Sequence, residues 1–76
     1  MNLQERIVVD SAVLAGKPIV RGTRLAVDFI VELLGHGWTE QQILDNYQGL
    51  QVEDIRACLI YAAEVVKTER VFPLAS

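Results

Sequence analysis

The sequence predicts a small, mainly α domain: three helices in a helix-turn-helix arrangement, preceded by a short N-terminal β element. Three observations carry this prediction. The β-branched run Ile7–Val9 indicates a strand, an apolar pattern with helical spacing begins at Ala26, and a capping sequence begins at Thr39. At 76 residues the chain has room for one core and therefore for one domain. Its expected parts are the β element and basic loop at 1–25, the three-helix unit at 26–68 and the tail at 69–76.

The β element is expected to be a ribbon of two short strands. Ile7–Val9 is followed by Asp10-Ser11, a pair typical of turns, and Ile19-Val20 is a second short apolar stretch that can pair with the first. Because two strands alone are unstable, the ribbon must lie on the helices or pair with a second chain.

The first helix is expected over Ala26–His36. Asp28 and Glu32 form a narrow polar stripe at i, i+4, and nearly all the other positions are apolar, so this helix should be buried on more than one side. We expect Gly37 to end it in a left-handed conformation, with Trp38 making the hydrophobic contact beyond.

The second helix is expected to open at Thr39, in a capping box with Gln42, and to stop at Gly49. The third runs from about Val52 to Lys67, after Gln51, which is a poor N-cap. Its expected apolar stripe consists of Val52, Ile55, Leu59, Ala62 or Ala63, and Val66, widened by Cys58, Tyr61 and Val65.

Composition favours a homodimer in the cytoplasm. Half of the residues are apolar, which is more apolar surface than a domain of this size can readily bury. We therefore expect a second copy or a permanent partner to cover part of it. We see no apolar run long enough for a membrane span, no signal peptide, and only one cysteine. The expected dimer interface consists of Ile7, Val9, Phe29, Leu33 and Ile60, the last of which lies opposite the apolar stripe of the third helix.

Positive charge is concentrated near the N-terminus. Residues 1–24 carry a net charge of +2 and residues 25–76 a net charge of −5. The basic loop, Gly16–Arg24, holds the residues that we expect to contact DNA phosphates, namely Lys17, Arg21, Thr23 and Arg24. Two other roles are open: an arginine can pair with Asp10 or Asp28 and brace the loop, or the loop can form the dimer seam.

The third helix is a poor DNA reader. A recognition helix presents its first turn to the major groove, but Glu53 and Asp54 in that turn repel phosphates. Arg56 is its one plausible base-reading side chain. If DNA is bound, the basic loop of a dimer is the favoured contact, and the alternative is that the three helices are a scaffold for protein binding.

No pattern indicates an enzyme, a metal site or a cofactor. His36 and Cys58 are single and far apart, whereas a zinc site needs about four ligands. The carboxylates have no adjacent base, and Lys17 does not lie in a phosphate-binding P-loop sequence.

The chain resembles a known family over nearly all of residues 7–66. The matching stretches are Ile7–Asp10, Gly16–Leu25, Leu33-Leu34 with Gly37, Ile43-Leu44 with Tyr47, Glu53–Ala57 and Tyr61–Ala63. They are similar to the domain-of-unknown-function family numbered four-three-three, whose members are considered VapB-like antitoxins with a homeodomain-like fold. The chain departs from the family pattern at Ser11, Ala26 and Gln51, which affects local stability only.

This resemblance implies an antitoxin of a type II toxin–antitoxin pair, which binds a PIN-like ribonuclease toxin and represses its own operon by binding operator DNA. Antitoxins of this kind often place a C-terminal segment in the toxin's groove, so the expected toxin contacts are Arg70, Val71, Phe72 and Leu74. The alternatives are a tail that folds back onto its own dimer and a dimeric protein-interaction module that does not bind DNA.

Overall fold

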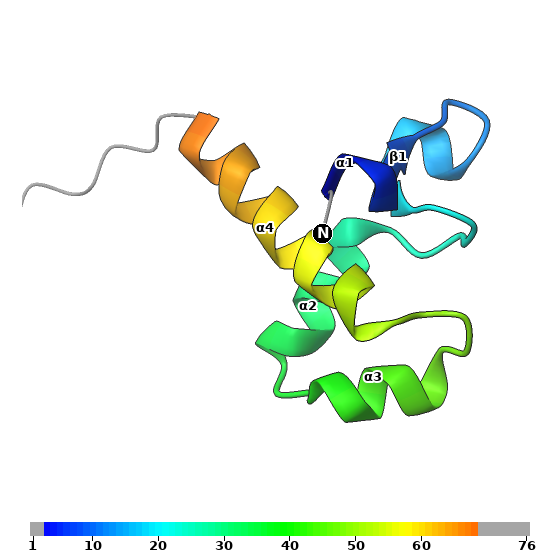
Figure 1. The fold of residues 1–76 in the computed structure, drawn as a ribbon. Helices are drawn as coiled ribbons and strands as arrows, with labels where there is room; N and C mark the ends of the chain where they lie inside the picture. The colour runs from blue at the N-terminus through cyan, green and yellow to red at the C-terminus, as the bar shows by residue number, and fades with distance from the viewer. Residues whose placement is uncertain (1–2, 69–76) are drawn as a thin grey trace, which may run out of the picture.

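The computed structural model describes residues 3–68, which form a mainly helical domain with a small β ribbon (Figure 1). The elements in chain order are α1 (Leu3–Arg6), β1 (Ile7–Val9), a 3₁₀ turn η1 (Leu14–Gly16), β2 (Pro18–Val20), α2 (Val27–Gly35), α3 (Glu40–Asn46) and α4 (Val52–Thr68). The predicted three helices and N-terminal β element are confirmed. The single turn α1 was not predicted from the sequence.

The two strands pair within one chain. β1 runs antiparallel to β2, with Ile7 opposite Val20 and Val9 opposite Pro18. An isolated bridge between Ile19 and Ala26 then joins β2 to the residue before α2. Ile7 and Val20 are both buried, so the ribbon lies on the helices, as a two-stranded element must.

α2 ends as its sequence predicts. The Gly37 amide donates to Leu34 O at 3.1 Å, and the Trp38 amide donates to Leu33 O at 3.0 Å, which is the Schellman pattern. Gly37 has φ +96°, a left-handed conformation that a side chain would strain. Trp38 packs against the core, and the chain therefore leaves α2 in a defined direction.

α3 begins with the predicted capping box. Thr39 Oγ1 accepts a hydrogen bond from the Gln42 amide at 3.1 Å, and the Thr39 amide donates to Gln42 Oε1 at 2.8 Å. The helix ends at Asn46, three residues before the predicted stop at Gly49, which has φ +96° in the turn toward α4.

One isoleucine from each long helix forms the centre of the core. Ile30 of α2, Ile43 of α3 and Ile55 of α4 are all completely buried. Cys58 of α4 and Val20 of β2 complete this centre. The core therefore lies where the three helices and the ribbon meet (Figure 1).

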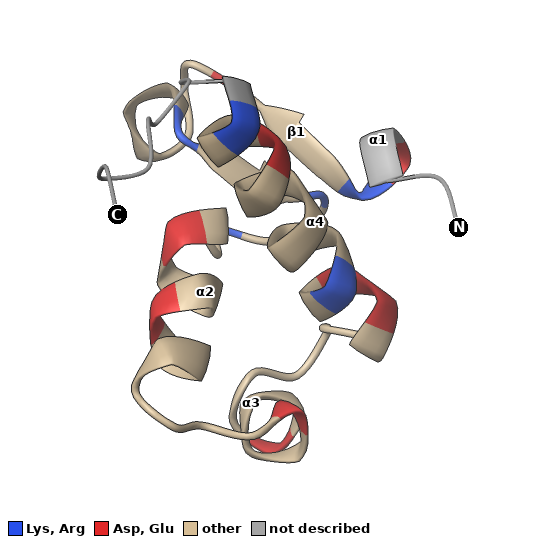
Figure 2. Cartoon of the chain, turned by 90° about the vertical axis from the view of Figure 1, so that its left-hand side faces the viewer, with Lys and Arg blue, Asp and Glu red and all other residues tan. Residues whose placement is uncertain are grey.

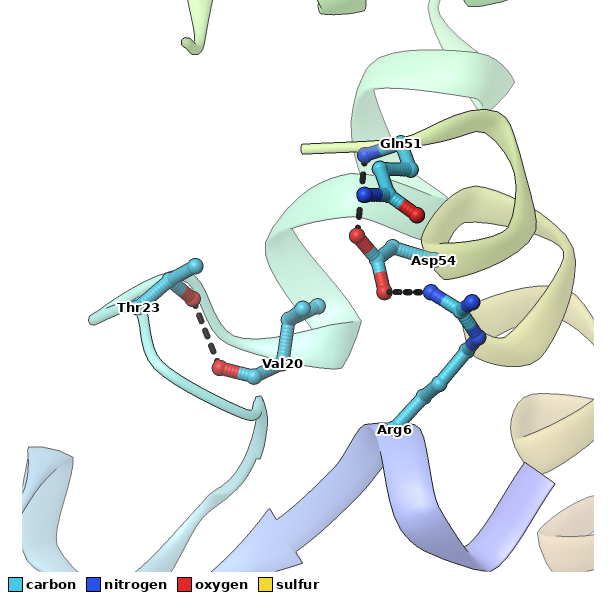
Figure 3. A network of polar contacts seen from close by, with 5 residues as sticks. All are labelled: Arg6, Val20, Thr23, Gln51 and Asp54. Atoms are coloured by element: carbon cyan, nitrogen blue, oxygen red, sulfur yellow. Dashed lines mark hydrogen bonds and ion pairs between the residues drawn. The ribbon is translucent and has the colours of Figure 1, made fainter. Parts of the chain in front are cut away.

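A carboxylate inside α4 replaces the missing N-cap. Asp54 Oδ2 accepts a hydrogen bond from the Gln51 amide at 2.9 Å, and Asp54 Oδ1 pairs with Arg6 Nη1 at 2.8 Å (Figure 3). The Gln51 side chain does not cap the helix. The Asp54 side chain, at the third position of α4, instead accepts the hydrogen bond of the Gln51 amide. The ion pair with Arg6 also ties the start of β1 to α4.

The predicted apolar stripe of α4 is buried only along its first half. Ile55, Ala57 and Cys58 are fully buried, whereas Leu59 is 42% exposed and Val66 56% exposed. The full burial of this stripe therefore stops at Cys58, and Leu59 and Val66 reach the surface. The physical reason is that α4 extends past the elements that cover its first half (Figure 1).

Within residues 3–68, no helix is both long and apolar enough to cross a bilayer.

The Arg6–Asp54 pair should contribute measurably to stability. Replacing Arg6 with Met keeps the apolar stem but leaves the Asp54 carboxylate buried without its partner, which we expect to lower the free energy of unfolding by about 2 kcal/mol. Urea unfolding followed by circular dichroism measures this loss. Lys17→Met is the matched control, because its pair with Asp28 is largely exposed and should contribute below about 1 kcal/mol. Equal losses in the two variants would contradict the structural role of Asp54.

The Cys58 thiol should be inert in the folded protein. Burial, assisted by the nearby Asp54 charge, raises the pKa of Cys58 from 9.0 to about 12. At pH 8 the native chain should therefore carry on the order of 1000-fold less thiolate than the unfolded chain, and alkylation by iodoacetamide should be slower by at least that factor. Similar alkylation rates in buffer and in urea would contradict the burial of this thiol.

The same shift predicts a pH dependence of stability. The native state favours the neutral thiol, because the pKa of Cys58 is higher in the folded chain than in the unfolded chain. The contribution of this thiol to the free energy of unfolding is therefore complete below pH 9 and is lost as the pH rises toward about 12. A Cys58→Ala variant should lack this part of the decline, while the contributions of the other titrating groups remain.

Candidate functional site

Hydrogen bonds within the chain close the second half of the basic loop, Val20–Leu25. The Val20 amide donates to Leu25 O at 3.0 Å, and the Thr23 amide donates to Val20 O at 3.0 Å. Thr23 Oγ1 donates to Val20 O at 2.8 Å (Figure 3). The same oxygen accepts a hydrogen bond from the Leu25 amide at 3.0 Å. The hydroxyl of Thr23, a predicted DNA contact, is therefore engaged within the loop itself.

Gly22 supplies the backbone conformation that this turn needs. It has φ +79°, in the left-handed region, and a Cβ placed there would meet no atom within 4 Å. The requirement for glycine is thus conformational rather than steric. The glycine and Thr23 together hold the neighbouring arginines on a defined backbone.

Lys17 is the loop cation that pairs with a carboxylate. Its Nζ lies 3.1 Å from Asp28 Oδ2, at the start of α2, and both side chains are more than half exposed. The sequence allows Arg21 or Arg24 to make such a pair with Asp10 or Asp28. The structure instead assigns Asp28 to Lys17, while Asp10 Oδ1 accepts from the Ala12 amide at 2.9 Å.

Arg21 and Arg24 remain available for a partner. Both are exposed, and in the part of the chain from residue 3 to residue 68 neither side chain makes a hydrogen bond or an ion pair. They line two different hollows. Arg24 lines a hollow with Lys17, Phe29 and Tyr47.

Arg21 lines a second, polar hollow with Arg6 and Asp54. Each hollow also contains two carboxylates, Asp28 and Glu32 beside Arg24, and Glu5 and Asp54 beside Arg21. The cations of the loop are therefore exposed but locally balanced by acids.

α4 presents little positive charge at its start. Arg56 is exposed, but Glu53 and Asp54 precede it in the first turn. Figure 2 shows red acidic positions on α2, on α3 and at the beginning of α4. Acids at the start of a helix repel a phosphate backbone, so the reading of the major groove by α4 stays a prediction that these charges disfavour.

The five predicted dimer residues fall into two groups. Ile7 is 8% exposed and belongs to the core of its own chain, so it has little surface to offer a partner. Phe29 and Leu33 are partly buried against the core, and the Phe29 ring meets Tyr47 edge to face, with centroids 5.6 Å apart. Val9, which is 62% exposed, and Ile60, which is 45% exposed, keep the surface that an interface requires.

Four predicted toxin contacts, Arg70, Val71, Phe72 and Leu74, lie outside the described residues. Among residues 3–68, no three His, Cys, Asp or Glu side chains are grouped closely enough to hold a metal ion.

The role of Arg6 was not predicted from the sequence. Its partner Asp54 is 48 positions away, so no local pattern could pair them. The available signal was indirect: Gln51 is a poor cap, and an acid three residues after a poor cap is a candidate to satisfy the helix start.

Comparison with known proteins places these features in a family. Residues 7–62 match the family described as "Protein of unknown function (DUF433)". An uncharacterized protein from Archaeoglobus fulgidus is 55% identical over 29 residues, which cover 38% of this chain and 81% of that protein.

The crystal structure of a DUF433 member protein from Anabaena variabilis superimposes with a TM-score of 0.79 at 30% identity. The match covers 87% of this chain and 65% of that one. The residues matched by the family model include the ribbon, the basic loop and most of α4. The chain therefore belongs to the DUF433 family.

Proposed function

We propose that this chain is the antitoxin of a type II toxin–antitoxin pair, which binds a PIN-like ribonuclease toxin and, as a homodimer, represses its own operon. The resemblance to VapB-like antitoxins supports the antitoxin role. The observation that carries the DNA-binding role is the exposure of Arg21 and Arg24, whose side chains have no partner within residues 3–68.

The loop suits phosphate oxygens better than α4 does. Arginine guanidinium groups bind phosphates in a bidentate manner, and the backbone beneath these two is held by Gly22 and Thr23. In a homodimer the loop occurs twice, which doubles the number of phosphate contacts. The acids at the start of α4 oppose the alternative docking through the helix.

Toxin neutralisation would use the C-terminal tail and one cation. PIN-like nucleases hold their metal ion with clustered acids, so an arginine such as Arg56 or Arg70 would fit that pocket electrostatically. Arg56 is exposed on α4 and makes no ion pair with residues 3–68. The apolar tail residues Val71, Phe72 and Leu74 would anchor the contact.

A second candidate is a dimeric protein-interaction module without DNA binding. The carboxylates beside Arg21 and Arg24 favour it, because they reduce the net positive potential that a phosphate backbone meets. Exposed apolar residues on the second half of α4 favour it as well.

Salt dependence separates the two candidates. The chain should bind the DNA upstream of its own gene, and the affinity should fall steeply with salt, as for any contact made by several cations. In the double variant Arg21→Ala/Arg24→Ala, a dimer loses four phosphate contacts, so the slope of log K against log salt should shrink by about 3 to 4. Fluorescence anisotropy on the labelled upstream fragment measures this slope.

The matched control is Arg56→Ala, which also removes an exposed arginine. At a protein concentration at which both variants are dimeric, it should leave the slope unchanged. No binding of the unaltered chain to the upstream fragment, even at low salt, would favour the interaction module over the repressor. A slope that responds only to Arg56→Ala would move the DNA contact to α4.

Removal of the tail tests the toxin contact. Purified from its native host on an N-terminal tag, the full chain should bring down a small nuclease in near-stoichiometric amount, identified by mass spectrometry. A chain that lacks residues 70–76 should lose this partner. The Arg21→Ala/Arg24→Ala variant should retain it, because its changes lie in the loop. Recovery of the nuclease with the shortened chain would contradict the tail contact, and recovery of the bare dimer from the full chain would contradict the antitoxin role.

A further inference from the structure

The second half of α4 exposes apolar side chains on two different sides. Val65 and Val66 line an apolar hollow against Val27 and Val31 of α2. Ile60 is 45% exposed and does not line that hollow. Ile60 lies on the far side of α4 from Ile55 and Cys58, which are both completely buried, and nearly half of its surface therefore remains exposed.

Four charged residues lie on the same face of α4 as Ile60, and all but the half-buried Glu53 are exposed. Glu53 lies seven residues and Arg56 four residues before Ile60. Glu64 lies four residues and Lys67 seven residues after it. At about 100° per residue these positions and Ile60 fall within an arc of roughly 80° on one helix face. In Figure 2 the red and blue positions of α4 accordingly form one group near each end, with an uncharged middle.

The order of these charges makes the face complementary to the same face of a second copy only when the two helices run antiparallel. From the N-terminus they run negative, positive, Ile60, negative, positive. If a second α4 lies antiparallel across Ile60, Arg56 meets the partner's Glu64, and Glu53 meets the partner's Lys67. If the two helices ran parallel, every charge would meet its own kind.

We propose that two copies of this chain pair through α4, antiparallel, with both Ile60 side chains at the two-fold axis. We assign this face to a second copy of the chain because a two-fold interface must be complementary to itself. The order of charges on α4 meets this requirement. Leu59, Ile60 and Ala63 supply the apolar contact, and the small side chain of Ala63 lets the helices approach closely.

The charges select the orientation and register of the pair. An exposed ion pair contributes little because water screens its charges, so the four pairs add only modest affinity to the apolar contact. Their larger effect is on the wrong arrangements, since a parallel pair or a shifted register places like charges opposite each other. This inference deepens the homodimer of the proposed function, but its tests need neither DNA nor toxin, so it can fail separately.

Charge exchange tests the pairing. Arg56→Glu and Glu64→Arg each place like charges opposite each other on both sides of the axis, so each variant should weaken the dimer about tenfold. The double variant Arg56→Glu/Glu64→Arg restores opposite charges and should return the dissociation constant to within about threefold of the starting value. Sedimentation equilibrium at low salt measures all three.

The control is Asp45→Arg, an equally large change of charge on the exposed surface of α3. It should leave the dimer unchanged, and circular dichroism confirms that each variant is folded. A double variant as weak as its parents would overturn the proposed register. A monomeric unaltered chain at micromolar concentration would overturn the pairing itself.

Disulfide trapping tests the direction independently. Two Ile60→Cys chains should cross-link under mild oxidation, because position 60 meets itself at the axis. Arg56→Cys chains should not, since antiparallel helices place the two copies of position 56 about 12 Å apart along the axis, beyond the reach of a disulfide. Cross-linking of both variants would indicate a parallel pair and overturn the proposal. The native Cys58 does not interfere, because it is fully buried.

Discussion

Asp54 holds the two parts of this domain together. One carboxylate oxygen satisfies the amide at the start of α4, and the other pairs with Arg6, the residue that leads into β1. A ribbon of two three-residue strands has no stability of its own, so its position depends on the contacts that fasten it to the helices. Ile7 and Val20 fasten it by apolar contact, and Arg6 adds a directional bond.

The same carboxylate limits what the helix-turn-helix unit can do. A recognition helix offers the side chains of its first turn to base edges, but here that turn contains Glu53 and Asp54. Asp54 is buried and already bound, and Glu53 repels a phosphate backbone. Two exposed arginines, Arg21 and Arg24, lie on the loop before α2, away from these acids of α4, which is why the proposed DNA contact is assigned to that loop.

α4 is longer than the core that it crosses. Its fully buried side chains end at Cys58, although the helix continues to Thr68. The remaining turns expose apolar residues between two groups of charges, a composition suited to a partner rather than to solvent alone. The proposed pairing of two copies uses the exposed face of α4, including these turns, and the proposed toxin contact uses the tail beyond them together with an exposed arginine. Both partners are thus assigned to parts of the chain outside the core, so binding either one requires no change in core packing.

Local interactions are what the sequence determined by itself. The capping box joins Thr39 to Gln42, and the end of α2 depends on Gly37 and Trp38, so every partner lies within about one helical turn. The ribbon was also predictable, because the chain contains two short β-branched stretches with a turn between them. The family could be identified for a related reason: its longest motif, Gly16–Leu25, is one continuous stretch of sequence.

Tertiary structure decided the contacts between distant residues. Arg6 and Asp54 are 48 positions apart, and Cys58 and Leu59 are neighbours in one predicted stripe, yet only Cys58 is buried. Lys17, Arg21 and Arg24 look equivalent in the sequence, but Lys17 alone reaches a carboxylate within residues 3–68. In each case the outcome depends on where another element lies in space, and periodicity along one segment contains no information about that position.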